Sequence, residues 1–234
     1  MITDAAPSVL PDSGHKAQAV EAMFDRIAPR YDALNRILTL GLDVRWRRRA
    51  VRELGLRRGA TVVDLACGTG DFCNELSRAG LRPIGVDFAA GMLMRARTEA
   101  PLLRADILQL PLRDESVDGA TCGFALRNVT DIAACFAETA RVLRPGGRVA
   151  FLEVSTPNNA VLRAGHGVYF QRVVPWVGAR LSDRAAYRYL PASASYLPAP
   201  DELQRMLAAS GFVGVHRIAL GGGAAQLLTA TRAA

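Results

Sequence analysis

Three aspartates stand at positions where they could meet around one ligand. Asp64, Asp87 and Asp106 each come at the end of a short apolar segment, and Asp71 follows a turn that contains two glycines. If the apolar segments are parallel strands, their carboxyl ends lie at one edge of a sheet, where doubly wound sheets bind their ligands. Carboxylates gathered at that edge would attract a cation and repel a diphosphate.

The glycine-containing turn belongs to the stretch DLACGTGDF of residues 64–72. Gly68 and Gly70 match the start of the G-x-G-x-x-G pattern of dinucleotide-binding proteins, but the third glycine would fall at Cys73. Asp71 also occupies the helix start where a pyrophosphate would bind. Both observations argue against an NAD-dependent reductase, the rival from another enzyme class.

S-adenosylmethionine fits this set of charges, because it has a sulfonium and an ammonium group and no phosphate. Asp87 is placed to accept hydrogen bonds from both ribose hydroxyls, and Asp106 from the adenine amino group. The glycines would let the backbone approach the methionine end. A lone G-x-G is a weak signal, and a single aspartate after a strand is often a helix cap. The combination is much more specific and predicts a methyltransferase.

Short apolar segments alternate with helical patterns after residue 60, which is typical of a parallel sheet covered on both faces by helices. Strands are predicted at 61–66, 83–87, 102–106, 117–124 and 148–154, helices at 71–79, 89–99 and 131–143, and a turn at RPGG, 144–147. A helix at about 200–210 then precedes two apolar runs, 213–220 and 224–232. These runs flank GGG and predict a closing hairpin.

The chain divides into three predicted parts. Residues 1–17 are expected to be frayed, and 18–56 form an N-terminal helical lid whose second helical stretch, about 34–55, is broken at Gly41. Residues 57–234 form the donor-binding domain, with a lid insertion at about 158–200.

Charge and composition narrow the class of protein further. The net charge is +7, and residues 45–58 hold seven arginines and one glutamate. This run is interpreted as a solvated helix face or as a surface attracted to anionic lipid. Nucleic acid is disfavoured, because no aromatic interleaving or recognition module accompanies the charge.

Cysteine spacing and hydropathy suggest a compartment. The four cysteines show no C-x-x-C pair, so neither a metal nor a disulfide framework is expected. No uncharged apolar run approaches the ~18 residues of a membrane span. The expected location is cytoplasmic.

Five stretches of the chain resemble the ubiquinone/menaquinone C-methyltransferase family, and the resemblance covers about residues 20–215. They are MFDRIAPRYDALNRILTLGLDVRWRR (23–48), VVDLACGTGD (62–71), GVDFAAGML (85–93), GFALRNVTD (123–131) and RVLRPGGRVAFLEVSTP (141–157). The resemblance implies a Rossmann-like class I methyltransferase fold, with a seven-stranded, mostly parallel sheet and an antiparallel C-terminal hairpin. It also implies C-methylation of a prenylated hydroquinone ring, such as demethylmenaquinol to menaquinol, with S-adenosylhomocysteine as the second product.

The resemblance implies that Thr69, Asp87, Asp106, Ile107 and the residue at position 123 contact the donor, and the neighbouring strand-end and turn residues complete the prediction. The predicted set is Asp64, Ala66, Gly68, Thr69, Gly70, Asp87, Phe88, Asp106, Ile107, Gly123 and Phe124. Relatives commonly have serine at position 123, and Ala125 replaces a glycine. Relatives also tend to end in TGGI..LH.G, where this chain has LGGGAAQLLTATRAA. If that segment touches the acceptor, the acceptor differs from the usual quinol.

Carbon methylation needs a nucleophilic ring, and a hydroquinone ring becomes nucleophilic when a hydroxyl near pKa 10 loses its proton. Arg127 and Asn128 are the candidates to stabilise the phenolate or to orient a water, and Tyr31 to polarise the acceptor. Arg127 is too basic to accept the proton itself. The alternatives are that Arg127 ties its loop to a carboxylate and that Tyr31 only packs. His166 lies in the lid insertion and is a weaker candidate.

A polyprenyl tail is insoluble in water, so contact with the inner membrane face is expected, and a homodimer is left open. Two other functions also stay open. One is a methyltransferase of the same fold that acts on a polyketide or terpenoid. The other is a non-catalytic module that binds the donor.

Overall fold

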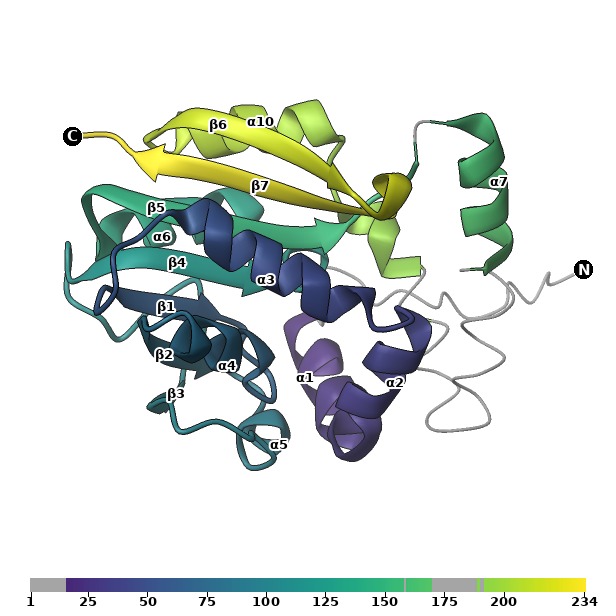
Figure 1. The fold of residues 1–234 in the computed structure, drawn as a ribbon. Coiled ribbons are helices and arrows are strands. Elements are labelled where there is room, and N and C mark those ends of the chain that lie inside the picture. The colour runs from purple at the N-terminus through teal and green to yellow at the C-terminus, as the bar shows by residue number, and fades with distance from the viewer. Residues whose placement is uncertain (1–15, 158, 170–188, 190–191) are drawn as a thin grey trace, which may run out of the picture.

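The computed structural model describes residues 16–157, 159–169, 189 and 192–234. Seven strands form one sheet in the order β3-β2-β1-β4-β5-β7-β6 (Figure 1). The strands are β1 (Thr61–Leu65), β2 (Arg82–Asp87), β3 (Leu102–Arg104), β4 (Val117–Gly123), β5 (Leu143–Val154), β6 (Phe212–Leu220) and β7 (Ala225–Arg232). The first five run parallel, and β7 pairs antiparallel with both β5 and β6. This is the predicted sheet with its closing hairpin.

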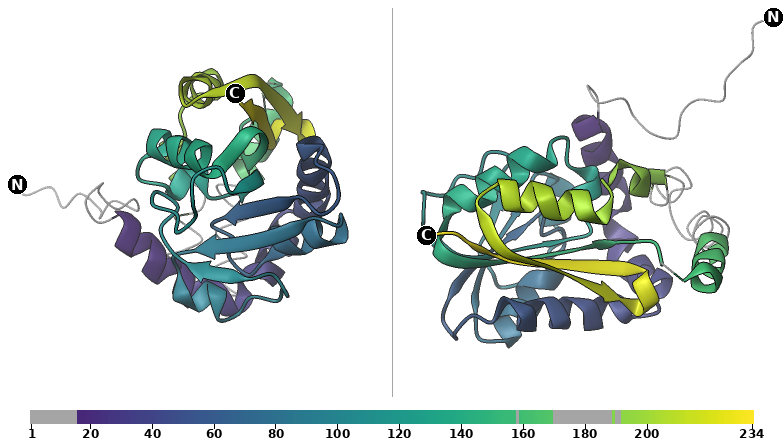
Figure 2. Two further views of the ribbon diagram at one scale, coloured as in Figure 1. Left: turned by 90° about the vertical axis from the view of Figure 1, so that its left-hand side faces the viewer. Right: turned by 90° about the horizontal axis from the view of Figure 1, so that it is seen from above.

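Helices cover both faces of the sheet (Figure 2). The face-covering helices are α3 (Leu42–Leu54), α4 (Asp71–Arg78), α6 (Ile132–Val142) and α10 (Pro200–Ala209). One core cluster joins α6 and α10 to the sheet and includes Phe136 and Phe151, whose ring centroids lie 5.0 Å apart. The other joins α3 and α4 to the opposite face through Leu54 and Leu76. Because both faces are buried, the central strands are rich in apolar residues, and polar residues such as Asp64, Thr121 and Glu153 are exceptions.

The first two helices lie elsewhere, beyond the carboxyl ends of the parallel strands (Figure 1). They are α1 (Lys16–Ile27) and α2 (Tyr31–Leu38), joined by the 3-10 turn η1 (Ala28–Arg30). Gly41 separates α2 from α3 with a φ of +72°, so the predicted break is a left-handed residue. The predicted lid of residues 18–56 therefore divides. Its first two helices cover the end of the sheet, whereas α3 packs on the face of the sheet against β5.

Two predicted elements differ from the structure. The helix expected at 89–99 is a single turn, α5 (Ala90–Leu93), because the chain then bends so that Arg97 N donates to Thr69 O at 2.9 Å. The RPGG turn lies inside β5 as an irregularity of its pairing with β4, and Gly146 has a φ of +77°. In both places tertiary pairing overrides a local preference.

The remaining described elements are short. They are the 3-10 turns η2 (Leu126–Asn128), η4 (Ala194–Tyr196) and η5 (Gly221–Gly223), and helix α7 (Ala160–Val168). Part of the predicted insertion at about 158–200 lies outside the described residues. All four cysteines are buried and free. Within the described ranges, no helix is long and apolar enough to span a membrane.

Candidate active site

A cavity of about 120 Å³ lies at the carboxyl ends of the parallel strands, and Val20 and Phe24 of α1 are among its lining residues. Most residues predicted to bind the donor line it: Asp64, Ala66, Gly68, Thr69, Asp87, Phe88, Asp106, Ile107, Gly123 and Phe124. Gly70 does not line the cavity and shapes the turn behind it. Asp71 and Asn128 are also in the lining. The structure therefore gathers the aspartates of the sequence pattern around one space, as parallel topology requires.

The turn after β1 owes its shape to residues in the left-handed backbone region. Gly68 has a φ of +56° and Gly70 of +89°. A Cβ on Gly70 would lie 2.7 Å from Thr98 Cγ2, so no larger residue fits. Ala66 (φ +52°) and Phe124 (φ +60°) also adopt this region, at a cost of about 1–2 kcal/mol each. Strained residues at two neighbouring strand ends are typical of a functional site.

Asp87 joins the two loops that flank the cavity. Its Oδ2 accepts a hydrogen bond from Gly68 N at 2.8 Å, and its Oδ1 accepts one from Ala89 N at 2.9 Å. Burial raises the pKa of Asp87, and these backbone N–H groups offset part of that effect. Each carboxylate oxygen keeps a second lone pair, so Asp87 can still accept from a ligand hydroxyl.

Asp64 is the most buried acid of the site. Its Oδ1 accepts from Thr121 Oγ1 at 2.8 Å, and Cys73 Sγ lies 3.6 Å from its Oδ2. Burial raises its pKa to about 7, and the hydrogen bond from Thr121 and the charge of Arg47 only partly oppose this. A cationic ligand group beside Asp64 would favour the ionised form.

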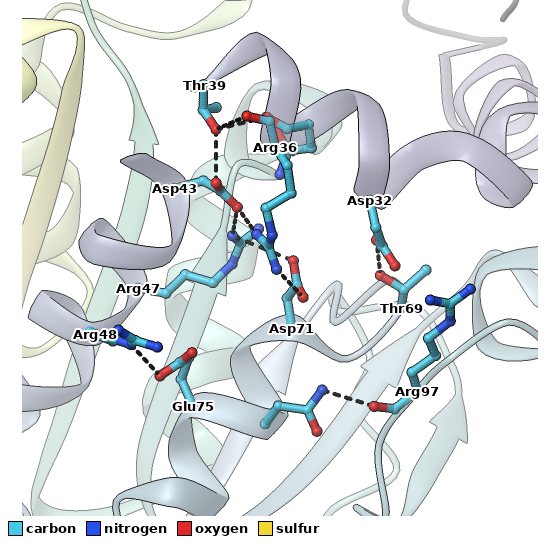
Figure 3. Close-up of polar contacts among 12 residues, drawn as sticks. Asp32, Arg36, Thr39, Asp43, Arg47, Arg48, Thr69, Asp71, Glu75 and Arg97 are labelled. Carbon is cyan, nitrogen blue, oxygen red and sulfur yellow. Dashed lines mark hydrogen bonds and ion pairs between the residues drawn. The ribbon is translucent and has the colours of Figure 1, made fainter. Parts of the chain in front are cut away.

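The cavity is less acidic than the sequence suggests, because Asp71 is paired (Figure 3). Arg36 Nη2 lies 2.9 Å from Asp71 Oδ1, and Arg47 Nη1 lies 3.5 Å from Asp71 Oδ2. Both arginines also pair with Asp43, which Thr39 Oγ1 contacts at 2.8 Å. Two positive and two negative side chains thus form one compensated cluster beside the cavity.

Asp43 is the fully buried member of this cluster. Burial opposes its ionisation, but the guanidinium of Arg47, the hydroxyl of Thr39 and the guanidinium of Arg36 outweigh burial and lower its pKa. Asp43 is therefore a fixed anion that holds both arginines in place.

The helical lid is bonded to the donor-side loops. Thr69 Oγ1 donates to Asp32 Oδ1 of α2, and Gly91 N donates to Asp25 Oδ1 of α1 at 2.7 Å. Lys16 Nζ donates to Val129 O at 2.8 Å. These contacts reach three separate loops, so the lid is attached around much of the cavity.

The candidate catalytic residues occupy different environments. Arg127 is buried, and it pairs through Nη1 with Glu153, which also accepts from Arg127 N at 3.3 Å. Arg127 does not line the cavity, so the structure favours the alternative in which it ties its loop to a carboxylate. Asn128 does line the cavity, and its Oδ1 accepts from Tyr189 Oη at 3.1 Å.

Two further residues were candidates for the acceptor site, Tyr31 and His166. The side chains of Tyr31 and His166 lie outside the described residues. Sequence reasoning missed Arg47, Glu153 and Tyr189. Arg47 was hidden within an arginine-rich run, and the other two carry no local signal.

Gly123 and Phe72 share space at the edge of the cavity. A Cβ on Gly123 would lie 2.9 Å from Phe72 Cε2. The serine implied by the family resemblance would therefore collide with this ring unless Phe72 moved.

The C-terminal segment from Leu220 onward, which differs from the pattern of the resembled family, lies away from the cavity. A Cβ on Gly221 would lie 2.7 Å from Trp46 Cζ2. The ring centroids of Trp46 and Phe124 lie 6.3 Å apart. Among the described residues, no lining residue follows Thr130. The changed segment therefore does not touch the described cavity.

The fold and this site define a class I S-adenosylmethionine-dependent methyltransferase. Solved structures with the same fold include the methyltransferase in a Haloferax volcanii complex with the Trm112 activator, at a TM-score of 0.66 and 20% identity over 90% of this chain and 98% of that chain. Another is a possible histamine N-methyltransferase from Thermotoga maritima, at a TM-score of 0.63 and 20% identity over the same shares. At these identities the similarity shows the fold alone.

The chain belongs to the ubiE/COQ5 methyltransferase family, whose pattern it matches over residues 12–232. It is 46% identical to the demethylmenaquinone methyltransferase of Roseiflexus sp. over 231 aligned residues, and these residues cover 95% of this chain and 97% of that protein. It is 45% identical to the corresponding enzyme of Thermus thermophilus over 81% of this chain and 91% of that protein.

Proposed function

We propose that this enzyme transfers the methyl group of S-adenosylmethionine to a ring carbon of a prenylated hydroquinone, with demethylmenaquinol as the favoured acceptor. The observation that carries the proposal is the near full-length similarity to proteins named demethylmenaquinone methyltransferase. The cavity is consistent with it, because it combines carboxylates with apolar side chains such as Phe24, Met92 and Leu108.

The donor supplies an activated methyl group, and the chain's own residues hold it. Asp87 accepts hydrogen bonds from the ribose hydroxyls, and Asp106 with Ile107 contacts the adenine. Thr69 and the turn of Gly68 and Gly70 border the methionine end. Three observations support this fit: the shared cavity, the lone pairs left on Asp87, and a glycine turn that lets a ligand approach the backbone.

Asn128 orients the acceptor. Because Tyr189 donates to its Oδ1, the amide is held with Nδ2 available as a donor. A donor at this position stabilises negative charge on the ring oxygen as the hydroxyl ionises, and so raises the nucleophilicity of the ring carbon. Arg127 does not touch the acceptor. Its ion pair with Glu153 of β5 fixes the loop that carries Asn128. Tyr31 stays a candidate to polarise the acceptor.

We also propose that the protein docks on anionic membranes through an apolar edge, formed by the exposed side chains Ile37, Leu40, Val161, Leu162 and Val168. Tyr169 Oη donates to Leu38 O at 2.8 Å, which places α7 beside the end of α2. Both helices lie beyond the carboxyl ends of the parallel strands, on the side where the cavity opens (Figure 1). A polyprenyl chain would reach the cavity from that side.

The arginine run contributes less to docking than its charge suggests. Arg47 is buried, Arg48 Nε lies 3.2 Å from Glu75 Oε2, and Arg49 Nη2 lies 2.6 Å from Glu53 Oε1. Arg45 is exposed in the first turns of α3 and is available to lipid headgroups. A homodimer stays a prediction.

The acceptor is tested with methyl-labelled donor and a panel of reduced naphthoquinols, benzoquinols and polyketides. We expect label on a ring carbon of demethylmenaquinol, identified by product mass and fragmentation. Asp87→Asn should lose most activity and donor affinity, whereas Asp114→Asn, on an exposed loop, should lose neither. Transfer to a polyketide, or donor binding without transfer to any quinol, would contradict the proposal.

A further inference from the structure

Arg47 is the one basic side chain among the described residues that line the cavity, where four carboxylates also lie. Its side chain is 7% exposed. Arg47 belongs to α3, the helix that packs on the face of the sheet against β5, and not to the lid helices α1 and α2. A buried cation at the border of a ligand cavity is costly unless an anion compensates it.

Two aromatic rings and two carboxylates fix the position of the Arg47 guanidinium. Its Cζ lies 5.6 Å from the ring centroid of Phe124 and 5.9 Å from that of Phe72, and both rings line the cavity. Nη1 makes both ion pairs, with Asp43 at 2.5 Å and with Asp71 at 3.5 Å. Among the described residues, Nη2 and Nε have no hydrogen-bond partner, so part of the planar donor set stays free for a ligand.

The methionine end of the donor carries an anion that the carboxylates cannot hold. Its ammonium and its carboxylate are attached to the same carbon, so a site for it needs a negative and a positive group side by side. Asp64, which makes no ion pair among the described residues, offers the negative group. Without a cation, the donor's carboxylate would lie among like charges, and this repulsion would lower the affinity for the donor.

We propose that Arg47 binds the α-carboxylate of S-adenosylmethionine and makes the site selective for donors that carry it. The inference rests on the proposed use of this donor. Guanidinium and carboxylate planes pair through two parallel hydrogen bonds, a geometry that lysine cannot reproduce. Asp43 acts as a positioning residue, because it pairs with Arg47 Nη1 at 2.5 Å and is itself fixed by a hydrogen bond from Thr39 Oγ1 at 2.8 Å.

The test compares two ligands by titration calorimetry: S-adenosylhomocysteine and its decarboxylated analogue, which keeps the ammonium group. The wild-type protein should prefer S-adenosylhomocysteine by about 10- to 100-fold. In Arg47→Gln this preference should disappear, because only the carboxylate-bearing ligand loses affinity. Arg47→Lys should keep part of it. Arg48→Gln, a matched change on the outer side of the same helix, should keep all of it.

The outcomes separate the two proposals. If the wild-type protein binds neither ligand, the proposed donor is wrong. If it binds both equally, or if Arg47→Gln and Arg47→Lys weaken both ligands by the same factor, the role assigned to Arg47 is overturned and the residue is structural. Circular dichroism and thermal melts establish that each variant is folded before its titration is interpreted.

Discussion

At the scale of single residues, the site depends on charges that are only partly compensated. Asp64 is buried with a hydroxyl and a thiol as neighbours, and its pKa is raised to about 7. The clustered arginines and aspartates beside it are instead mutually paired. Asp64 therefore has no basic side chain paired with it among the described residues, and its raised pKa makes the stability of the ligand-free protein dependent on pH.

The first prediction concerns that dependence. Because the folded pKa of Asp64 exceeds the unfolded value of about 3.8, the folded state binds the extra proton, and stability is lost as pH rises from about 4 to 7. Asp64→Asn removes this loss. We expect the variant to gain on the order of 1–4 kcal/mol relative to the wild-type protein between pH 5 and pH 8, measured by urea unfolding without ligand.

Asp118→Asn provides a control of opposite sign. Burial is the largest single influence on the pKa of Asp118 and would raise it, but the N–H of Thr61 at 2.7 Å and the guanidinium of Arg144 together outweigh burial and lower the pKa. Its stabilisation is present above about pH 4 and is lost in acid. A gain in Asp64→Asn that stayed constant across the pH range would contradict the account.

At the scale of elements, the junction between α2 and α3 turns the chain from the lid onto the sheet. Gly41 makes this turn with a φ of +72°, and its Cβ position is open space. Space is therefore not the constraint, and the backbone conformation alone demands glycine.

The second prediction isolates that backbone effect. Gly41→Ala should destabilise the protein by about 1 kcal/mol, because alanine pays to adopt the left-handed region. Gly165→Ala, inside α7 and equally open, should be neutral or stabilise by up to about 1 kcal/mol, because helical alanine is favoured over glycine. Both are measured by urea unfolding, and equal effects would refute the argument.

At the scale of the whole molecule, α1, α2 and α7 lie beyond the carboxyl ends of the parallel strands (Figure 1). The cavity is lined by residues at the same ends, and the apolar edge is carried by α2, the turn after it and α7. Such a grouping of exposed apolar side chains is unusual on a protein surface that meets only water. It suits an enzyme whose acceptor carries a long lipid tail.

The third prediction tests the proposed docking. The double variant Leu40→Asp/Val161→Asp should lower the affinity for anionic vesicles by about tenfold or more, because it removes buried apolar area and adds repelled charges. The double variant Met94→Asp/Val213→Asp changes two exposed apolar residues elsewhere on the surface, and this control should bind as the wild type does. Vesicle sedimentation at two salt concentrations provides the measurement. Equal binding by all three proteins would remove the edge from consideration.

Much of this architecture could be predicted because its signals are local. The apolar runs that became β1, β2, β4, β6 and β7, the glycine turn after β1 and the break at Gly41 depend on residue type, period and backbone preference. Once the strands are parallel, topology alone brings Asp64, Asp87 and Asp106 to one cavity. The one-turn α5 was missed because Arg97 bonds to the glycine turn, a partner that local propensity does not represent.

The sequence by itself therefore determined the order of the elements, the end of the sheet at which the site lies and the negative groups that border it. Only the tertiary structure decided which charges remain free. The sequence does not distinguish Arg47 from the other six arginines of its run. The packing of α3 does, because it places Arg47 beside Asp71 and the cavity. Arg127 was a candidate for the acceptor until β5 placed Glu153 against it. The reason is physical: a charge acts on whatever lies within a few ångströms, and that neighbour is chosen by the packing of distant segments.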